Sequence, residues 1–354
     1  MNIPKGPRMS ISLPKLGRAR PLFFLVRWLS TDVAYLWGAM LLLVASVSSA
    51  RAGDTAAEVR QWLDKMSHSS QKINFEGTFF YRRGDQVTAM KIVHVADENG
   101  ERERLNSLNG PVREIVRDRG VARITMDKKS VVIEKRGGAR SLASKTPEQI
   151  DQIEKYYDFS LGGESRTANR LVRIVNIVPK DAYRYGYRVS LDQQTGTMLQ
   201  SDLLNEEGTP IEQVMFITFD LLDKVPPAVR EPAGIHPDGS QVSQPLLAGG
   251  EGWRVGRMPG GFVLAEHYRH QVPHSQAFMN HMVLTDGLAS VSVFIEKNNS
   301  HHASPFVGVS RMGVANAYGT RINDYQVTVV GEVPVATVEM IGKSIKHHGP
   351  GAAK

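Results

Sequence analysis

Four strand patterns between residues 170 and 221 follow one another without an amphipathic helix between them. The segment 192–196 (DQQTG) joins two of them and is typical of a hairpin turn. Parallel strands need a crossover of a dozen or more residues, usually a helix. The sequence therefore predicts a large antiparallel sheet, with strands at Arg170–Val178, Tyr183–Leu191, Met198–Leu204 and Ile211–Leu221.

The preceding residues add strands and two helices to this sheet. Apolar residues at helical spacing predict an opening amphipathic helix at residues 54–67. Thr146 and Pro147 predict the N-cap and first turn of a helix that reaches Tyr156. Short strands are expected at residues 75–81, 90–95, 101–106, 112–117, 121–126 and 130–134. A sheet of this kind that curls, with helices at its mouth, can enclose a ligand cavity.

Proline and glycine concentrate between residues 223 and 250, where large apolar residues are few, and this composition predicts an extended linker. The residues after it have their own strand patterns, and Pro334 opens a helix whose Val335, Val338, Ile341 and Ile345 share a face. We expect a large domain at residues 53–222, the linker at 223–250, a small antiparallel sheet with one helix at 251–346, and a disordered tail at 347–354.

Residues 1–52 have the order basic, apolar, small that is typical of a secretory signal peptide. Residues 1–50 carry six basic side chains and one acidic one, and residues 33–47 (VAYLWGAMLLLVASV) form an apolar run. That run is shorter than the ~20 residues that span a bilayer. We expect cleavage after Ala50 or Ala52 and export to the periplasm. A retained signal anchor is the alternative.

Charge and cysteine content exclude two classes of function. The formal net charge is +7, and residues 1–50 contribute +5 of it. Nucleic-acid binding needs a basic surface that replaces the counterions around phosphates, so no nucleic-acid partner is expected of the nearly neutral remainder. The sequence has no cysteine, which excludes thiol catalysis, thiolate metal sites and lipid attachment through a cysteine after the signal peptide.

The sequence has no G-x-S-x-G elbow, phosphate-binding glycine loop or H-E-x-x-H motif. Pro273 disfavours a helix that would bring two histidines four residues apart together. Histidines three apart on a strand point to opposite faces. We therefore expect surface histidines rather than a metal site, no catalytic residue and no cofactor, with a metal hydrolase as the alternative. The histidines concerned are His267, His270, His274, His281, His301 and His302.

Residues 75–85 (FEGTFFYRRGD) have two interpretations. Phe75, Phe79 and Tyr81 share one face of a strand, which is either the core face of the sheet or the wall of an apolar cavity for an acyl chain. Arg82 and Arg83 belong either to a solvated turn or to a contact with an anionic headgroup or an acidic partner segment.

Four strings, in order along nearly the whole mature chain, resemble the MucB/RseB family of periplasmic negative regulators of the sigma-E type envelope-stress sigma factor. They are residues 75–85 above, 285–296 (TDGLASVSVFIE), 315–319 (ANAYG) and 331–338 (GEVPVATV). The resemblance implies an N-terminal domain like the lipoprotein carriers LolA and LolB, which is an unclosed antiparallel β-barrel with helices, followed by a smaller C-terminal domain. The fold class expected is thus α+β, mainly β.

The resemblance also implies a partner and no enzyme activity. Family members bind the periplasmic domain of a single-span anti-sigma factor of the MucA/RseA kind and protect it from site-1 proteolysis, and lipid or lipopolysaccharide weakens that hold. A homodimer is left open. A flexible linker would let the domains change relative position. The alternative hypothesis is a periplasmic lipid or lipoprotein carrier that uses the same cavity without a regulatory partner.

Overall fold

The computed structural model describes residues 56–98, 100–118, 121–126, 129–134, 142, 145–226, 247–248, 252–271, 278–297 and 306–347. The expected signal peptide, residues 227–246 and 249–250 of the expected linker and residues 348–354 of the expected tail lie outside these ranges. We call residues 56–226 the first module and residues 247–347 the second module. None of the helices in the described ranges combines the length and the apolar character needed to cross a membrane.

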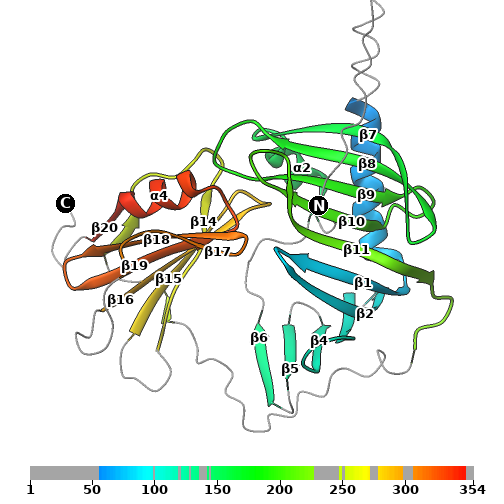
Figure 1. The fold of residues 1–354 in the computed structure, drawn as a ribbon, viewed down its shortest axis with the longest axis horizontal. Coiled ribbons are helices and arrows are strands. Elements are labelled where there is room, and N and C mark those ends of the chain that lie inside the picture. Colours follow the sequence, from blue (N-terminus) through cyan, green and yellow to red (C-terminus); the bar gives the residue numbers. More distant parts are fainter. Residues whose placement is uncertain are drawn as a thin grey trace, which may run out of the picture. The chain divides into compact units, whose positions relative to one another are not determined.

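The first module contains an eleven-stranded antiparallel sheet with the order β6-β5-β4-β3-β2-β1-β11-β10-β9-β8-β7. The first strand pairs with the last, so β1 lies between β2 and β11 in the middle of the sheet (Figure 1). The two edge strands, β6 and β7, are joined in the chain through α2. The strands are β1 (Phe75–Arg83), β2 (Gln86–Asp97), β3 (Gly100–Ser107), β4 (Arg113–Asp118), β5 (Val121–Met126), β6 (Lys129–Glu134), β7 (Tyr157–Thr167), β8 (Arg170–Pro179), β9 (Gly186–Asp192), β10 (Met198–Leu204) and β11 (Pro210–Leu221).

Two helices pack against this sheet, as the sequence predicts. The first covers residues 56–72 and buries Val59, Leu63 and Met66 at helical spacing. The second, α2 (Pro147–Ile153), begins with the expected cap, because the Thr146 side chain accepts a hydrogen bond from the backbone N–H of Gln149. Both helices contribute to one apolar cluster with strands β8 and β9.

Strand β7 is absent from the sequence-based prediction, which extended α2 to Tyr156. Its sequence, YDFSLGGESRT, has no apolar alternation in its second half. Gly162 and Gly163 lie where its register with β8 shifts, as is common at a bulge on an edge strand. Because an edge strand packs few of its side chains, its sequence carries little of the signal that reveals a central strand.

The second module contains a seven-stranded antiparallel sheet with the order β12-β14-β15-β16-β19-β18-β17, beside the short pair β13-β20. Its strands are β12 (Leu247–Ala248), β13 (Trp253–Val255), β14 (Val263–Gln271), β15 (Phe278–Thr285), β16 (Ser290–Lys297), β17 (Gly308–Met312), β18 (Ala315–Ile322), β19 (Tyr325–Gly331) and β20 (Ile345–His347). The helix expected after Pro334 is α4 (Val335–Ser344).

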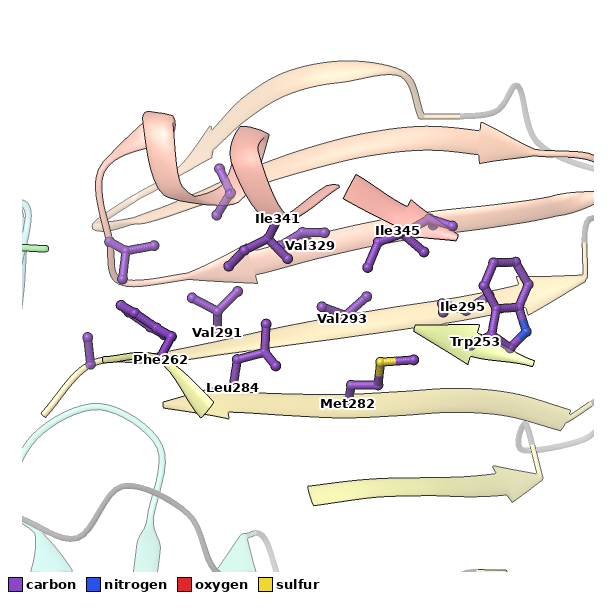
Figure 2. Close-up of a cluster of buried hydrophobic side chains, with 14 residues drawn as sticks. Trp253, Phe262, Met282, Leu284, Val291, Val293, Ile295, Val329, Ile341 and Ile345 are labelled. Carbon is purple, nitrogen blue, oxygen red and sulfur yellow. The ribbon is translucent and has the colours of Figure 1, made fainter. Parts of the chain in front are cut away.

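One face of this sheet and α4 form the core of the second module. Figure 2 shows Ile341 of α4 beside Val329, above Val291 and Val293 of the central strand β16. Each of these four side chains is fully buried. The expected fold class, a large unclosed antiparallel sheet with helices and a smaller antiparallel sheet with one helix, is confirmed.

Candidate functional site

A buried arginine connects the two modules. Arg184 lies in the loop between β8 and β9, and its side chain is 0% exposed. Its Nη1 donates to Oδ2 of Asp286 at 2.8 Å and its Nη2 donates to the backbone oxygen of Gly260 at 2.5 Å, and both acceptors belong to the second module. Its Nε donates to Oδ1 of Asp181 at 3.1 Å within the first module. Every guanidinium nitrogen is therefore bonded, as a buried arginine requires.

Three aromatic rings surround the guanidinium. Its Cζ lies 5.0 Å from the ring centre of Tyr156, 5.4 Å from that of Tyr157 and 5.3 Å from that of Phe262. Their negative faces stabilise a cation that burial has stripped of water. Gly261 makes this packing possible, because a Cβ there would lie 2.4 Å from Cε2 of Tyr156.

Asp286 organises the opposite side of the contact. Its Oδ1 accepts hydrogen bonds from the backbone N–H groups of Leu288 and Ala289, at 2.9 and 2.7 Å, which fixes the turn between β15 and β16. Its Oδ2 accepts from Arg184 and, at 3.0 Å, from the hydroxyl of Tyr157. The turn also delivers Leu288 to the apolar cluster of the first module. The Asp286 carboxylate thus stabilises the turn and also binds it to the first module.

Two neutral hydrogen bonds flank this ion pair. The Nδ2 of Asn316 donates to the hydroxyl oxygen of Tyr185 at 3.0 Å and to the backbone oxygen of Val333 at 2.7 Å. The Oγ1 of Thr337, on α4, donates to the backbone oxygen of Tyr183 at 2.5 Å. Tyr183 and Tyr185 adjoin Arg184 in the same loop. We call the residues that meet here, Tyr156, Tyr157, Tyr183 to Tyr185, Gly260 to Phe262, Asp286 to Leu288, Asn316 and Thr337, the intermodule contact.

A second, more exposed ion pair lies beside the contact and uses one of the sequence-predicted residues. Arg83 donates from Nη2 to Oε1 of Glu332 at 2.7 Å, with 40% and 43% of the two side chains exposed. Its neighbour Arg82 donates from Nη2 to the backbone oxygen of Pro210 at 3.2 Å. Both arginines therefore make bonds within the chain, and their contact with a partner or a headgroup stays a prediction.

Tyr81, also predicted from the sequence, donates its hydroxyl hydrogen to Oε2 of Glu212 at 2.9 Å. Burial and the Glu212 charge raise the pKa of Tyr81, so its hydroxyl stays protonated and remains a donor. Burial and repulsion from Glu332 raise the pKa of Glu212, against the opposing effects of Tyr81 and Arg83. Of these groups, Arg83 and Glu332 form the bond between the end of β1 and the second module.

Phe75 and Phe79 lie apart from this contact, in an aromatic cluster on the buried face of the first sheet. They are 8% and 7% exposed. The ring of Phe75 lies 5.0 Å from that of Phe219, and the ring of Phe79 lies 5.5 Å from that of Phe216. These rings fill the core beneath β1, β2 and β11. Their role as the wall of a lipid cavity stays a prediction.

The histidines do not converge in the described part of the chain. His281 pairs with Tyr268 across β14 and β15, whereas His267 pairs with Met282 and so points to the other face. The His281 ring stacks on Phe294 with the ring centres 4.2 Å apart. Within the described residues no group of three or more potential ligands could hold a metal ion. His274, His301 and His302 lie outside those residues.

Two family models match the chain, one for each module. The MucB/RseB N-terminal domain matches residues 58–233 and the MucB/RseB C-terminal domain matches residues 248–346. The chain belongs to the MucB/RseB family.

Curated relatives of this MucB/RseB chain are named as regulatory proteins. Sigma factor AlgU regulatory protein MucB of Pseudomonas aeruginosa is 32% identical over 320 residues, which is 87% of this chain and 96% of MucB. Sigma-E factor regulatory protein RseB of Escherichia coli K12 is 26% identical over 328 residues, which is 88% of this chain and 98% of RseB. A chain in the solved complex of Pseudomonas aeruginosa MucA and MucB superposes with a TM-score of 0.65 at 29% identity, covering 82% of this chain and 99% of that one.

The four strings that carry the resemblance to MucB/RseB each place a polar side chain between the modules. The residues are Arg83, Asp286, Asn316 and, in the last string, Glu332 with Thr337. The sequence identifies these strings but does not predict that they contact one another in the fold, because they lie far apart along the chain.

Arg184 was missed, since residues 183–191 were predicted to form one strand. The strand β9 instead begins at Gly186, and residues 183–185 form a loop whose Tyr183 oxygen bonds to the second module. The one available signal was an arginine between two tyrosines (YRY), which is too common a pattern to indicate a buried contact.

Proposed function

We propose that this MucB/RseB chain binds the periplasmic part of a MucA-like anti-sigma factor, protects it from site-1 proteolysis and so restrains an envelope-stress sigma factor. The observation that carries the proposal is the match to MucB in both modules, including 99% of a chain from its solved complex with MucA. A second structure of MucB, solved with the periplasmic part of MucA, superposes with a TM-score of 0.63 at 29% identity. A match over both modules supports a shared binding function better than a match over one, because the fold of a single module does not by itself imply a function.

We place this function in the periplasm. The basic, apolar and small segments of residues 1–52 support export, and the absence of cysteine is compatible with it. Restraint by protection requires only that the bound segment be held where a protease cannot engage it, so the proposed role is binding without catalysis.

A lipid or a lipopolysaccharide fragment is proposed as the releasing ligand. It would weaken partner binding only if it bound the free form better than the complex. The support for this part is the apolar face of the first sheet, whose side chains pack together as a core and would have to separate to admit an acyl chain. The same observation supports the carrier hypothesis. The two hypotheses differ in one expected result, which is whether the protein binds the anti-sigma segment.

The test is calorimetry with the protein purified from the cell in its processed form. The titrant is a synthetic peptide that spans the periplasmic part of the MucA-like protein from the same genome, and a scrambled peptide is the control. We expect micromolar or tighter binding that added lipopolysaccharide weakens. Binding of lipid without any binding of the peptide would overturn the proposal and support the carrier.

A further inference from the structure

The two modules are held together mainly by directional polar bonds. Their apolar cores are separate clusters, and Leu288 is the second-module residue that packs into a first-module cluster in the described part of the chain. The ion pair of Arg184 and Asp286 is instead buried at the centre, with neutral hydrogen bonds on its flanks. Hydrogen bonds with fixed donors and acceptors define an orientation more narrowly than apolar contact does.

A buried ion pair between modules behaves differently from one inside a module. Opening the contact returns both charges to water, so the loss of their attraction is offset by regained hydration. Removing Arg184 while the contact stays closed leaves the Asp286 charge buried without an ion partner, which is strongly unfavourable. Arg184 keeps its ion pair with Asp181 when Asp286 is removed, so that change costs less. The ion pair of Arg184 and Asp286 therefore favours one closed arrangement, and the removal of Arg184 favours opening.

We propose that Arg184 and Asp286 are positioning residues for the anti-sigma segment: their ion pair holds the two modules in the one orientation in which both contact the segment. This inference rests on the proposed function. The ion pair would thus raise the affinity for the anti-sigma segment although neither residue contacts that segment. A partner that binds only the joined arrangement has its apparent dissociation constant multiplied by the inverse of the fraction of molecules in that arrangement.

The chain provides a matched control for this pair. Arg170 donates from Nε and Nη2 to the two oxygens of Asp192, at 2.8 and 2.9 Å, and Asp192 is 2% exposed. Its guanidinium also lies over an aromatic ring, that of Phe219, at 5.4 Å. Both residues lie within the first sheet. Arg170→Met therefore leaves a buried aspartate without its arginine, as Arg184→Met does, but leaves the intermodule contact intact.

The experiment measures orientation and affinity in the same variants. Since the natural sequence has no cysteine, Ser160→Cys on β7 and Arg321→Cys on β18, both at exposed positions, accept one nitroxide label each. Electron paramagnetic resonance then gives the distribution of distances between the modules. Calorimetry gives the affinity for the anti-sigma peptide.

We expect a narrow distance distribution in the labelled parent and in Arg170→Met, and a broad one in Arg184→Met. We expect the dissociation constant to rise at least about tenfold in Arg184→Met, which corresponds to a joined fraction of one tenth or less. It should stay within about twofold of the parent in Arg170→Met. Equal loss of affinity in the two variants would assign the effect to general destabilisation and overturn the inference.

A milder variant guards against misfolding of Arg184→Met. Thr337→Val removes the hydrogen bond from α4 to the Tyr183 oxygen without leaving a charge unpaired. It should broaden the distance distribution and weaken binding in the same direction, by a smaller factor. A broadened distribution with unchanged affinity would overturn the positioning role.

The experiment distinguishes a wrong positioning role for Arg184 and Asp286 from a wrong proposed function. If the parent does not bind the peptide, the proposed function fails, whatever the labels report. If the parent binds and Arg184→Met binds as tightly, the function stands and the positioning role is wrong.

Discussion

Tyr157 donates its hydroxyl hydrogen to Oδ2 of Asp286 across 3.0 Å, although 129 positions separate the two residues in the chain. Tyr157 is the first residue of an edge strand in one sheet, and Asp286 lies in a hairpin turn of the other. Burial and the charge of Asp286 raise the pKa of Tyr157, so its hydroxyl stays protonated and remains a donor. The bond therefore joins the first residue of a strand in one sheet to a turn of the other.

Replacing Tyr157 by Phe tests the value of this bond. The change removes one donor to a buried carboxylate, and we expect the free energy of unfolding to fall by roughly 1.5–3 kcal/mol, the usual range for a hydrogen bond to a charged group. Tyr81→Phe is the matched comparison, because its hydroxyl bonds the less buried Glu212, and its effect should be smaller. Urea denaturation measures both, and equal losses would contradict the assigned difference.

Acid should destabilise the first module through Glu103. Burial opposes ionisation of this carboxyl, but hydrogen bonding from His94 and the charge of Arg117 outweigh it and lower the pKa to about 2 from the usual 4.5. A lowered folded-state pKa adds stability that is fully present above pH 4.5 and is lost as the pH falls from 4.5 towards 2. The contribution is roughly 2–3 kcal/mol.

Urea midpoints measured between pH 7 and pH 2.5 check this loss. Glu103→Gln should be less stable than the parent at pH 7 and should lose less stability on acidification. Arg117→Ala removes one of the partners that hold the charge, at 2.7 Å from Oε2 of Glu103, and should fall between the two. An unchanged acid dependence in Glu103→Gln would assign it to other carboxyl groups.

Phe79→Ala separates the two interpretations of the first strand. If the ring is core, its removal should lower the free energy of unfolding by about 3–5 kcal/mol. A ring that lines an empty lipid cavity would instead tolerate truncation and lose affinity for lipid. Denaturation with and without a short acyl lipid distinguishes these outcomes. Because Phe79 is 7% exposed and contacts Phe216, we expect the core result.

Gly261 and Gly208 form a natural pair for testing the intermodule contact. Both have positive φ, +84° and +75°, so alanine is strained at each by roughly 1–2 kcal/mol. A Cβ at Gly208 meets nothing within 4 Å, whereas one at Gly261 would lie 2.4 Å from the Tyr156 ring. Gly261→Ala should therefore destabilise the protein more than Gly208→Ala in thermal or urea unfolding. Equal effects would show that the Tyr156 ring moves aside freely.

The ion pair of Arg83 and Glu332 should contribute little to stability. Both side chains are about two-fifths exposed, and exposed pairs are worth about 0.2–1 kcal/mol. A double-mutant cycle with Arg83→Ala and Glu332→Ala measures the coupling, which added salt should reduce. A loss of partner affinity in Arg83→Ala without a loss of stability would support the predicted partner contact of Arg83. A coupling energy well above 1 kcal/mol would contradict this expectation and show that the ion pair stabilises the fold.

Elements that pack a regular apolar face were predictable. The helices after residue 55 and after Thr146 and Pro334, and the central strands of both sheets, carry period or capping signals that do not depend on the rest of the chain. The strand β7 and the loop at residues 183–185 were not, because an edge strand buries few side chains and the loop is held by bonds to another module.

The predicted site residues divide in the same way. Phe75, Phe79 and Tyr81 follow from strand alternation, which places them on one face but does not say whether that face meets side chains or a ligand. The fold supplies Phe216 and Glu212 from β11, which reaches β1 only because the first and last strands pair.

The sequence by itself determined the antiparallel class, the two modules and the family, because hydrophobic period, turn residues and family strings are local properties of the chain. Only the tertiary structure decided that Arg184 is buried and that Asp286 is its partner. From sequence alone a charged residue is predicted to be exposed, because burial requires a specific partner of opposite charge. The partner of Arg184 is Asp286, which lies 102 positions away in the chain.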